Sequence, residues 1–546
     1  MRHDLPLLPE RSRFYNSPFF LTVSFALIAA LVTAIKLLRL SSRELWMDEA
    51  YSALLSSMSW KQMFNTICGD VHPPLYYFLL WGWVRAAGNS EQALRLFSVL
   101  ISAVALTAFF FVARKWMDAR YAAFAGMLFA LSPVLYNYSL EVRMYMLGVT
   151  LSIVLLGLHR KVTAEGEAGW QPVLLYGIFG ALLYYTHYIG IFILIALFLD
   201  WGIAARLRPG ALRRLGVAAL IVAELTAPWY PVMMQQRHAK LAQIQKMNAL
   251  EAAPTSLSFG KAVQQPPSTS NQVVSILYES GAAAGMYPAT SLWLKIVFRF
   301  PLAILLAGVL YHAARGDSIC RLFVLMSFAL ACGLFFLLRL FQLRYLLEVL
   351  PFLFLAIART IEIGWKPKWK PFAAAIALFT LIAYSAGFYK EAKIIHDRPL
   401  SRLVALLKER YRRNDVLVFY PAQEQVNFDY YAQQARFHPQ ESGFPDTIYS
   451  WWEHESSKGW AVRVGNRAEL ESAAAGLEKC PQPRTVWLLL KRENIFDPQG
   501  LFVKRMSEMG DAMEISYQNR SERNSRDILD GNPRFRLVAI SEKGQR

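Results

Sequence analysis

The sequence predicts a polytopic α-helical membrane protein with a smaller α/β domain at its C-terminal end. Hydrophobic residues make up 55% of the 546 residues and charged residues only 18%, below the roughly 25% of ordinary soluble domains. Long apolar runs recur over residues 1–390, whereas residues 391–546 have the mixed composition of a soluble domain. Basic residues gather in short clusters between the apolar runs, as the topology of a membrane protein requires.

The net charge of +18 does not indicate a nucleic-acid-binding protein. Much of the Lys and Arg follows the ends of apolar runs, where positive charge sets the orientation in the membrane. Four cysteines in a chain of this length do not make a disulfide framework. Cys68 and Cys480 could both face an oxidising compartment, and whether they pair stays open at this point.

The first apolar run, Pro18–Ile35, is about long enough to span a bilayer. Arg2, Arg11 and Arg13 precede it. The positive-inside rule therefore places the N-terminus in the cytoplasm and Asp48 on the outer side.

The next apolar run, Leu75–Val84, is too short to span and follows Pro73 and Pro74. Proline suits the first turn of a helix, so we expect a helix that lies at the outer membrane surface. Counting this run as a span would put several basic clusters outside, against the positive-inside rule. Without it, about eleven spans result. The later ones are expected near residues 92–113, 121–136, 144–158, 172–187, 188–205, 215–234, 292–312, 321–339, 345–363 and 371–389.

This topology gives two outer loops of interest, residues 41–91 and residues 235–289. It also places residues 391–546 outside the membrane on the same side. Strands alternate there with helices, which favours an α/β domain. The expected strands are Asp415–Tyr420, Thr485–Leu490 and Phe535–Ile540, and the expected helices are Arg402–Arg410 and Phe428–Gln434.

Acidic, His, Arg and Tyr side chains collect on the predicted outer side. Arg presents a planar, charged fork to phosphate oxygens. A carboxylate can take the proton of an attacking hydroxyl, and a cation stabilises charge that develops on a leaving phosphate. Together these groups indicate transfer from a phospholipid-like donor to a hydroxyl. The candidate site residues are Asp48, Glu49, His72, Tyr76, Glu141, Arg143, Tyr145, His187, Arg344 and Tyr345.

Several of these residues occur in short motifs whose order is specific although each motif is short. The motifs are Trp46-Met47-Asp48-Glu49, His72-Pro73-Pro74-Leu75-Tyr76-Tyr77, Leu140-Glu141-Val142-Arg143-Met144-Tyr145, Thr186-His187-Tyr188 and Arg344-Tyr345. Over residues 15–390 the chain resembles the GT-C membrane glycosyltransferases, specifically the bacterial family-39-like group. That group is related to protein O-mannosyltransferases and to the aminoarabinose transferases of lipid A.

The resemblance implies a hexosyl- or pentosyltransferase of the bacterial inner membrane. Its donor would be a sugar on a polyprenyl phosphate such as undecaprenyl phosphate, and its reaction a single inverting displacement. Asp48 would be the catalytic base with Glu49 in support, and Arg143 and Arg344 would contact the donor phosphate. Some relatives bind a divalent metal, for which His72, Glu141 and His187 are the candidates. The acceptor, whether lipid, polysaccharide or protein, leaves no mark in the sequence.

Several of these residues have plainer interpretations. Glu49 would suit a helix's first turn simply by complementing the dipole, His72 would shape the turn before the prolines, and His187 would join an aromatic interface belt. Glu141 and Arg143 lie two apart, so we expect separate contacts and not a mutual ion pair. For Arg344, the i, i+4 spacing to Glu348 predicts that Glu348 orients it.

Two other functions are compatible with a multi-span chain. A transporter or flippase of a lipid-linked substrate would place its polar groups near the middle of the bilayer. A membrane-anchored scaffold would need only one span. The gathering of polar groups at the outer edge favours the transferase over both.

Overall fold

The computed structural model describes most of the chain. The described ranges are residues 18–163, 169–206, 208–252, 292–333, 343–394, 398–420, 424–444, 467–479, 485–491, 500–515 and 535–541. The predicted cytoplasmic head, Cys480 and most of the predicted outer loop lie outside these ranges. The pairing of Cys68 with Cys480 is therefore an open question here as well.

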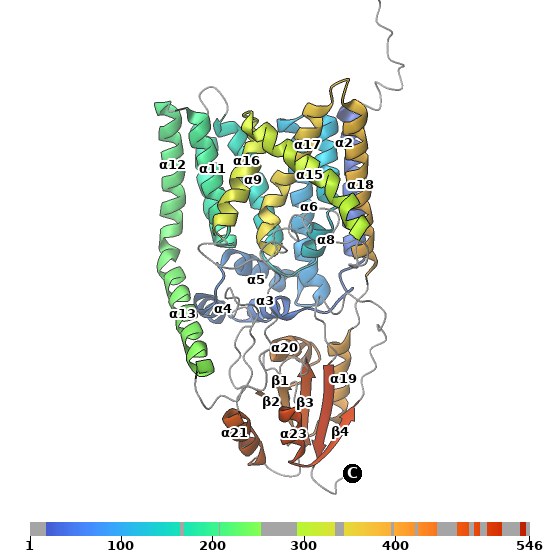
Figure 1. Cartoon of the computed structure of the whole chain (residues 1–546). Helices are drawn as coiled ribbons and strands as arrows, with labels where there is room; N and C mark the ends of the chain where they lie inside the picture. The colour runs from blue at the N-terminus through green and yellow to red at the C-terminus, as the bar shows by residue number, and fades with distance from the viewer. Residues whose placement is uncertain are drawn as a thin grey trace, which may run out of the picture.

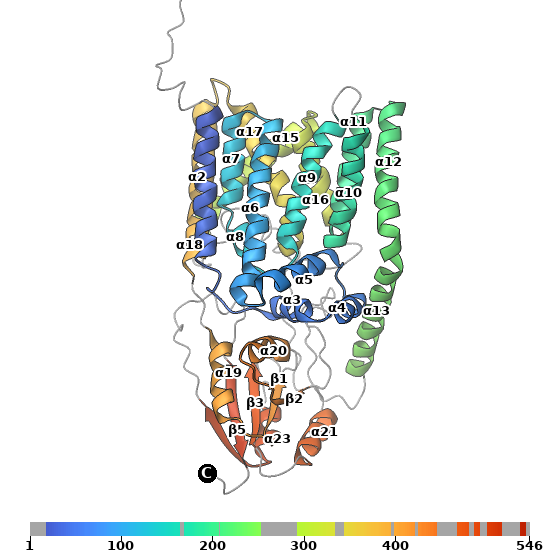
Figure 2. The same cartoon turned by 180° about the vertical axis from the view of Figure 1, so that it is seen from behind.

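Apolar helices form a bundle (Figures 1 and 2) in which α15 crosses its neighbours obliquely. A helix satisfies every backbone polar group within its own segment, which is what a lipid environment demands. The helices of the bundle are α2 (Pro18–Leu37), α6 (Glu91–Trp116), α7 (Ala119–Ala130), α9 (Tyr145–Thr163), α10 (Trp170–Thr186), α11 (Gly190–Ala205), α12 (Pro209–Thr226), α15 (Leu292–Ala314), α16 (Ser318–Cys332), α17 (Leu350–Gly364) and α18 (Lys370–Lys393).

Within the described ranges, five helices are long and apolar enough to cross a membrane. A sixth span results if α7 and α8 (Pro133–Ser139), which are bent by 57° at their junction, count as one. The shorter apolar helices include Gly190–Ala205, Ala303–Ala314 and Ser318–Cys332. The structure thus supports a multi-pass helical membrane protein. It does not fix the predicted number of about eleven spans, because several expected spans are helices shorter than a bilayer requires.

Three short helices lie across one end of the bundle (Figure 1). They are α3 (Met47–Ser57), α4 (Trp60–Gly69) and α5 (Leu75–Ala87). Helix α5 begins directly after Pro74, as predicted, and runs across the bundle instead of through it. Ser59 and Gln62 form the capping box that begins α4. Only Met58 and Ser59 lie between the end of α3 and the start of α4.

The predicted outer loop at 235–289 begins differently from the prediction. After the short η1 (Ala227–Trp229), α13 (Tyr230–Ala252) continues from α12 past the end of the bundle and lies beside α4 (Figure 2). Residues 235–252 are therefore helical. The physical reason is their composition, which is rich in Gln, Ala, Leu, Met and Lys and free of Gly and Pro until Pro254.

The C-terminal α/β unit lies beyond the layer of α3, α4 and α5 (Figures 1 and 2). Its five-stranded sheet has the order β2-β1-β3-β5-β4; β1 is parallel to β2 and β3, and β5 is antiparallel to β3 and β4. The elements are α19 (Pro399–Arg410), β1 (Val416–Tyr420), α20 (Glu424–Gln434), β2 (Gln440–Gly443), α21 (Arg467–Glu478), β3 (Thr485–Lys491), α23 (Leu501–Ser507), β4 (Asp511–Ile515) and β5 (Phe535–Ser541). The three predicted strands and both predicted helices are present, whereas β2 and β4 were not predicted.

Alternate residues of β1 belong to two different cores, as the period of a strand requires. Leu417 and Phe419 pack on the side of α19 and α20, in one continuous cluster with the bundle. Val416, Val418 and Tyr420 pack on the opposite face with α21 and α23. The C-terminal unit and the bundle therefore share apolar packing beneath α3.

Candidate active site

Helix α3 is fixed at its start by Glu49. One carboxylate oxygen, Oε1, accepts from the backbone N–H of Val142 at 3.0 Å. The other, Oε2, accepts from Trp46 N at 3.2 Å and from Arg95 Nη2 at 3.4 Å. Glu49 and Arg95 are completely buried. Both oxygens of Glu49 are thus engaged inside the protein, which suits a residue that positions Asp48.

Arg95 was not among the candidates, yet it ties the start of α3 to two other segments. Its guanidinium donates to the carbonyl oxygens of Leu40, Arg43, Glu44 and Leu140 at 2.6–3.1 Å. The sequence carried a usable signal, because a charged residue inside a predicted span is a functional candidate by default.

Asp48 lies one residue inside the start of α3 and is buried. Its Oδ2 accepts from Arg344 Nη1 at 3.3 Å and lies 4.0 Å from Arg143 Nη2. Its Oδ1 has no hydrogen-bond partner among the described residues. Oδ2 of Asp48 therefore faces two cations, and Oδ1 remains able to accept a hydrogen bond or a proton.

Arg143 is held on several sides. Its Nη1 donates to Ser52 Oγ at 3.3 Å and to Tyr77 Oη at 3.2 Å, and its Nη2 lies 3.0 Å from His72 Nε2. Because a guanidinium can only donate, His72 Nε2 must accept. Tyr77 was not predicted, although it directly follows the predicted Tyr76.

The proton of the His72 ring therefore lies on Nδ1, which is 3.3 Å from Asp70 Oδ2. Burial and the neighbouring charge of Arg143 lower the pKa of His72, so the imidazole is neutral near pH 7. The result is a continuous chain of contacts from Asp70 through His72 and Arg143 to Asp48.

His187 and Glu348 form a second pair, with 3.0 Å between Nδ1 and Oε1. The prediction that Glu348 orients Arg344 is corrected here, because the Glu348 carboxylate contacts His187. Residues 343–349 form the 3₁₀ helix η3 (Leu343–Val349) and not an α-helix. With three residues per turn, side chains four apart do not share a face.

Aromatic rings surround these charges. The rings of Tyr145 and Tyr345 lie 6.2 Å and 6.1 Å from the ring of His187. The guanidinium of Arg344 lies 5.7 Å from the ring of Tyr345 and 6.0 Å from that of Trp46. Tyr76, in contrast, is buried among other rings, with its ring centre 5.9 Å from that of Tyr77 and 6.0 Å from that of Phe97.

Glu141 makes a contact separate from that of Arg143, as the spacing predicts. Its carboxylate lies 3.7 Å from Arg43, and its backbone oxygen accepts from Ser98 at 2.6 Å. Burial raises the pKa of Glu141 to about 7, against the opposing charge of Arg43. Shifted pKa values are more common at functional sites than elsewhere, which agrees with the place of Glu141 among the candidate residues.

The metal candidates are not gathered into one cluster. Across the described ranges, no three His, Cys, Asp or Glu side chains are close enough together to hold a metal ion. His72 faces Arg143 and Asp70, His187 faces Glu348, and Glu141 faces Arg43.

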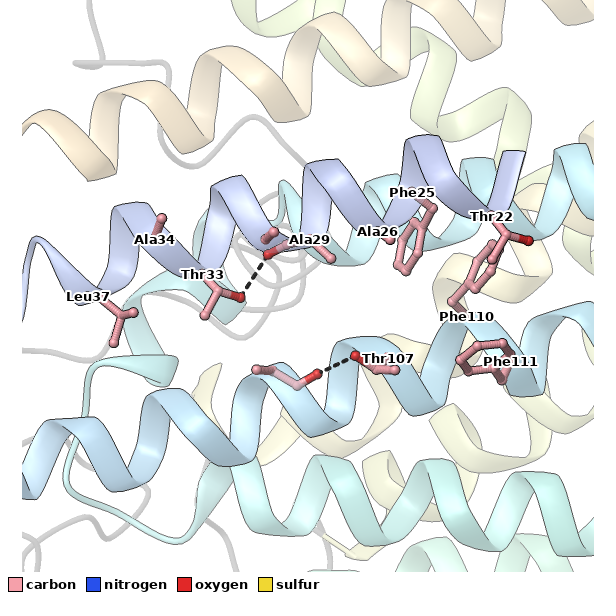
Figure 3. Close-up of a pocket in the computed structure, with 12 residues that line it drawn as sticks. Thr22, Phe25, Ala26, Ala29, Thr33, Ala34, Leu37, Thr107, Phe110 and Phe111 are labelled. Atoms are coloured by element: carbon pink, nitrogen blue, oxygen red, sulfur yellow. Dashed lines mark hydrogen bonds between the residues drawn. The ribbon is translucent and has the colours of Figure 1, made fainter. Parts of the chain in front are cut away.

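A cavity of about 540 Å³ lies elsewhere, between α2 and α6 (Figure 3). It is lined by Ala, Thr, Phe and Leu side chains, among them Phe25, Thr33, Thr107 and Phe110. None of the predicted site residues lines it. In Figure 3 the hydroxyls of Thr33 and Thr107 turn back to their own helix backbones, so this part of the cavity presents apolar surface.

The fold and the site together define a class of protein. A multi-pass helical bundle is covered at one end by short helices, and one of these carries a buried carboxylate that lies against two arginines. This is the architecture of the GT-C membrane glycosyltransferases, and the comparisons with known proteins agree.

Residues 71–231 match the family model described as dolichyl-phosphate-mannose-protein mannosyltransferase. The structure is similar to that of ArnT from Cupriavidus metallidurans in the apo state, with a TM-score of 0.57, 14% identity and coverage of 95% of this chain and 98% of that chain. The same relative bound to undecaprenyl phosphate gives a TM-score of 0.55 at 14% identity with the same coverage.

The oligosaccharyltransferase of Archaeoglobus fulgidus in the apo form matches with a TM-score of 0.52 at 13% identity, over 91% of this chain and 75% of that chain. No curated protein matches the sequence. The recognition made from the motifs is confirmed, and the chain has the GT-C fold.

Proposed function

We propose that the protein transfers a sugar from a polyprenyl-phosphate donor to a hydroxyl acceptor at the outer face of a bacterial inner membrane. The observation that carries this proposal is the state of Asp48, whose Oδ2 faces Arg143 and Arg344 while its buried Oδ1 lacks a hydrogen-bond partner among the described residues. The similarity to a protein bound to undecaprenyl phosphate supports a donor of that chemical class.

In the proposed reaction, the acceptor hydroxyl attacks the anomeric carbon from the face opposite the phosphate. Its proton passes to Asp48 Oδ1 while the bond between the anomeric carbon and the phosphate oxygen breaks. The configuration inverts, and polyprenyl phosphate leaves with the electron pair of that bond. Arg344 lies where it can stabilise the charge that develops on the leaving phosphate.

The other predicted residues then take supporting roles. Glu49 positions the start of α3, and Arg143 holds Asp48 and His72. His187, Tyr145 and Tyr345 form the wall beside Arg344. The C-terminal α/β unit would then lie outside the membrane, on the same side as the site.

The test compares Asp48→Asn with Asp118→Asn in the purified protein. Asn keeps the shape of the side chain and removes the base, so release of undecaprenyl phosphate from undecaprenyl-phosphate-linked hexoses or pentoses should fall by about 100-fold or more. Asp118 is exposed, directly precedes α7 and has its ion-pair contact with Arg120, which is not a site residue. Its variant should therefore behave as wild type. Lipid, polysaccharide and peptide acceptors are supplied in parallel.

An Asp48→Asn variant that retains wild-type release rules out Asp48 as the base. A transporter or flippase is the alternative function. It would be supported by movement of the intact lipid-linked sugar across vesicles containing the protein, with no cleavage of the sugar–phosphate bond.

A further inference from the structure

The C-terminal α/β unit packs directly on the helix that carries Asp48. In both views α20 lies beneath α3, and the two helices are in contact (Figures 1 and 2). Helix α3 is thus enclosed between the bundle on one side and α20 on the other. The proposed reaction does not use this contact.

The most direct link is the hydroxyl of Tyr431 on α20. It accepts a hydrogen bond from the backbone N–H of Leu45 at 2.7 Å, immediately before the start of α3. It also donates to Glu91 Oε1 in the first turn of α6. Burial and the charge of Glu91 raise the pKa of Tyr431, so the hydroxyl remains a donor.

Glu91 is itself held from the C-terminal side, since Arg398 Nη2 donates to its Oε2 at 2.8 Å. One turn further along α6 lies Arg95, which reaches Glu49. Glu91 therefore couples the C-terminal unit to the same helix that anchors α3. Tyr431 joins the starts of α3 and α6 through one oxygen atom.

A second set of hydrogen bonds joins the segment before α3 to the C-terminal unit. Glu44, which directly precedes Leu45, accepts from the backbone N–H groups of Leu400 and Ser401 at 3.1 Å and 2.8 Å. These amides lie in the first turn of α19, where unpaired N–H groups favour a carboxylate. Two consecutive residues before α3 are thus bonded to the C-terminal unit.

Resting on the proposed function, we infer that Tyr431 is a positioning residue and that the C-terminal unit sets the place of Asp48. Without its hydroxyl, Leu45 N and Glu91 Oε1 would each lose a buried partner. The start of α3 would then be held less tightly, by the contacts of Glu49, Arg95 and Glu44 alone, and the Asp48 carboxylate would shift relative to Arg143 and Arg344.

The test uses Tyr431→Phe, which keeps the ring and removes only the oxygen. Its matched control is Tyr411→Phe, because Tyr411 also donates one bond (to Asp415 O) and accepts one (from Gln440 N, at 2.7 Å), but entirely within the C-terminal unit. We expect kcat of Tyr431→Phe to fall about tenfold or more while KM for the undecaprenyl-phosphate-linked sugar stays within about twofold. Tyr411→Phe should keep the wild-type kcat.

Amide hydrogen exchange over residues 45–52 provides a readout that does not depend on activity. Exchange there should quicken in Tyr431→Phe and not in Tyr411→Phe, because Leu45 N loses its acceptor only in the first. Should Tyr431→Phe fail to fold, Glu91→Gln removes the charge that Tyr431 and Arg398 share and should give the same two changes.

Unchanged exchange over residues 45–52 together with an unchanged kcat would overturn the inference, and so would equal losses in the two tyrosine variants. If exchange over residues 45–52 is faster in Tyr431→Phe but even the wild-type protein transfers no sugar, the positioning of α3 by Tyr431 is supported. The proposed function is then refuted instead.

Discussion

Replacing Arg143 with lysine tests whether the charge at this position or the geometry of its fork supports the site. Arg143 contacts Ser52 and Tyr77 through Nη1 and His72 through Nη2. A lysine ammonium is a single point donor and cannot occupy both places. The variant keeps the positive charge beside Asp48 but must leave one side of this arrangement without its partner.

The size of the effect follows from burial. A buried polar group left without its hydrogen bond costs about 1–3 kcal/mol. Taking about 2 kcal/mol, and about 1.4 kcal/mol for each factor of ten, the transfer rate should fall roughly thirtyfold. The loss should appear mainly in kcat, because Asp48 would be misplaced whether or not the donor is bound.

The matched control is Arg359→Lys. Arg359 also bridges two partners with its fork, Asp317 at 2.8 Å and Glu362 at 2.6 Å. Arg359 lies in the second half of α17, which ends at Gly364. Its variant should lower thermal stability in detergent while leaving the transfer rate within about twofold, because the partners it loses, Asp317 and Glu362, do not contact the candidate site.

Both variants would be compared by initial release of undecaprenyl phosphate at saturating donor and by thermal unfolding. If Arg143→Lys transfers at the wild-type rate, the fork does not position Asp48. If Arg359→Lys loses as much activity as Arg143→Lys, the loss reports general destabilisation and the reasoning fails.

Two further predictions follow from the packing and charge of the site. In Gly148→Ala the new Cβ would clash with Glu348 Oε1, so the carboxylate must leave His187 and activity should fall about tenfold. Gly202→Ala is the control and should keep full activity, because its Cβ meets nothing closer than 3.9 Å. Equal activity in both variants would contradict the role of the His187–Glu348 pair. Glu141→Gln should flatten the pH dependence of stability. The folded-state pKa of Glu141 is raised to about 7, so its contribution is complete below about pH 4.5 and is lost as pH rises towards 7. Melting temperatures in detergent between pH 5 and 8 should fall with pH in wild type and fall less in the variant, and parallel curves would refute the assignment.

The sequence predicted the site's members better than their partners. Asp48, His72, Arg143 and Arg344 are far apart in the chain, yet the predicted sidedness and the motifs placed them together, and the structure joins them through Arg143 and Asp48. Sidedness follows from composition and from the placement of basic clusters, which a single sequence displays in full.

The partners depend on local geometry that composition does not reveal. Glu348 pairs with His187 because residues 343–349 form a 3₁₀ helix. No residue type in that segment predicts a 3₁₀ helix in place of an α-helix. Arg95 and Tyr431 contact α3 from elsewhere in the sequence, and Tyr431 does so across 386 positions. Such contacts arise from tertiary packing, which no periodicity encodes.

The two arginines beside Asp48 are not equivalent, which bears on how a phosphate could enter the site. Arg143 is almost fully buried, with a 3% exposed side chain, and has partners on both terminal nitrogens, so moving it would break several hydrogen bonds at once. Arg344 is 11% exposed and has one hydrogen bond in the described structure, to Asp48 Oδ2. An incoming phosphate would compete with that one bond and gain a bidentate partner in return. In the proposed reaction, Arg344 would therefore be the cation that exchanges partners, whereas Arg143 would keep the carboxylate in place.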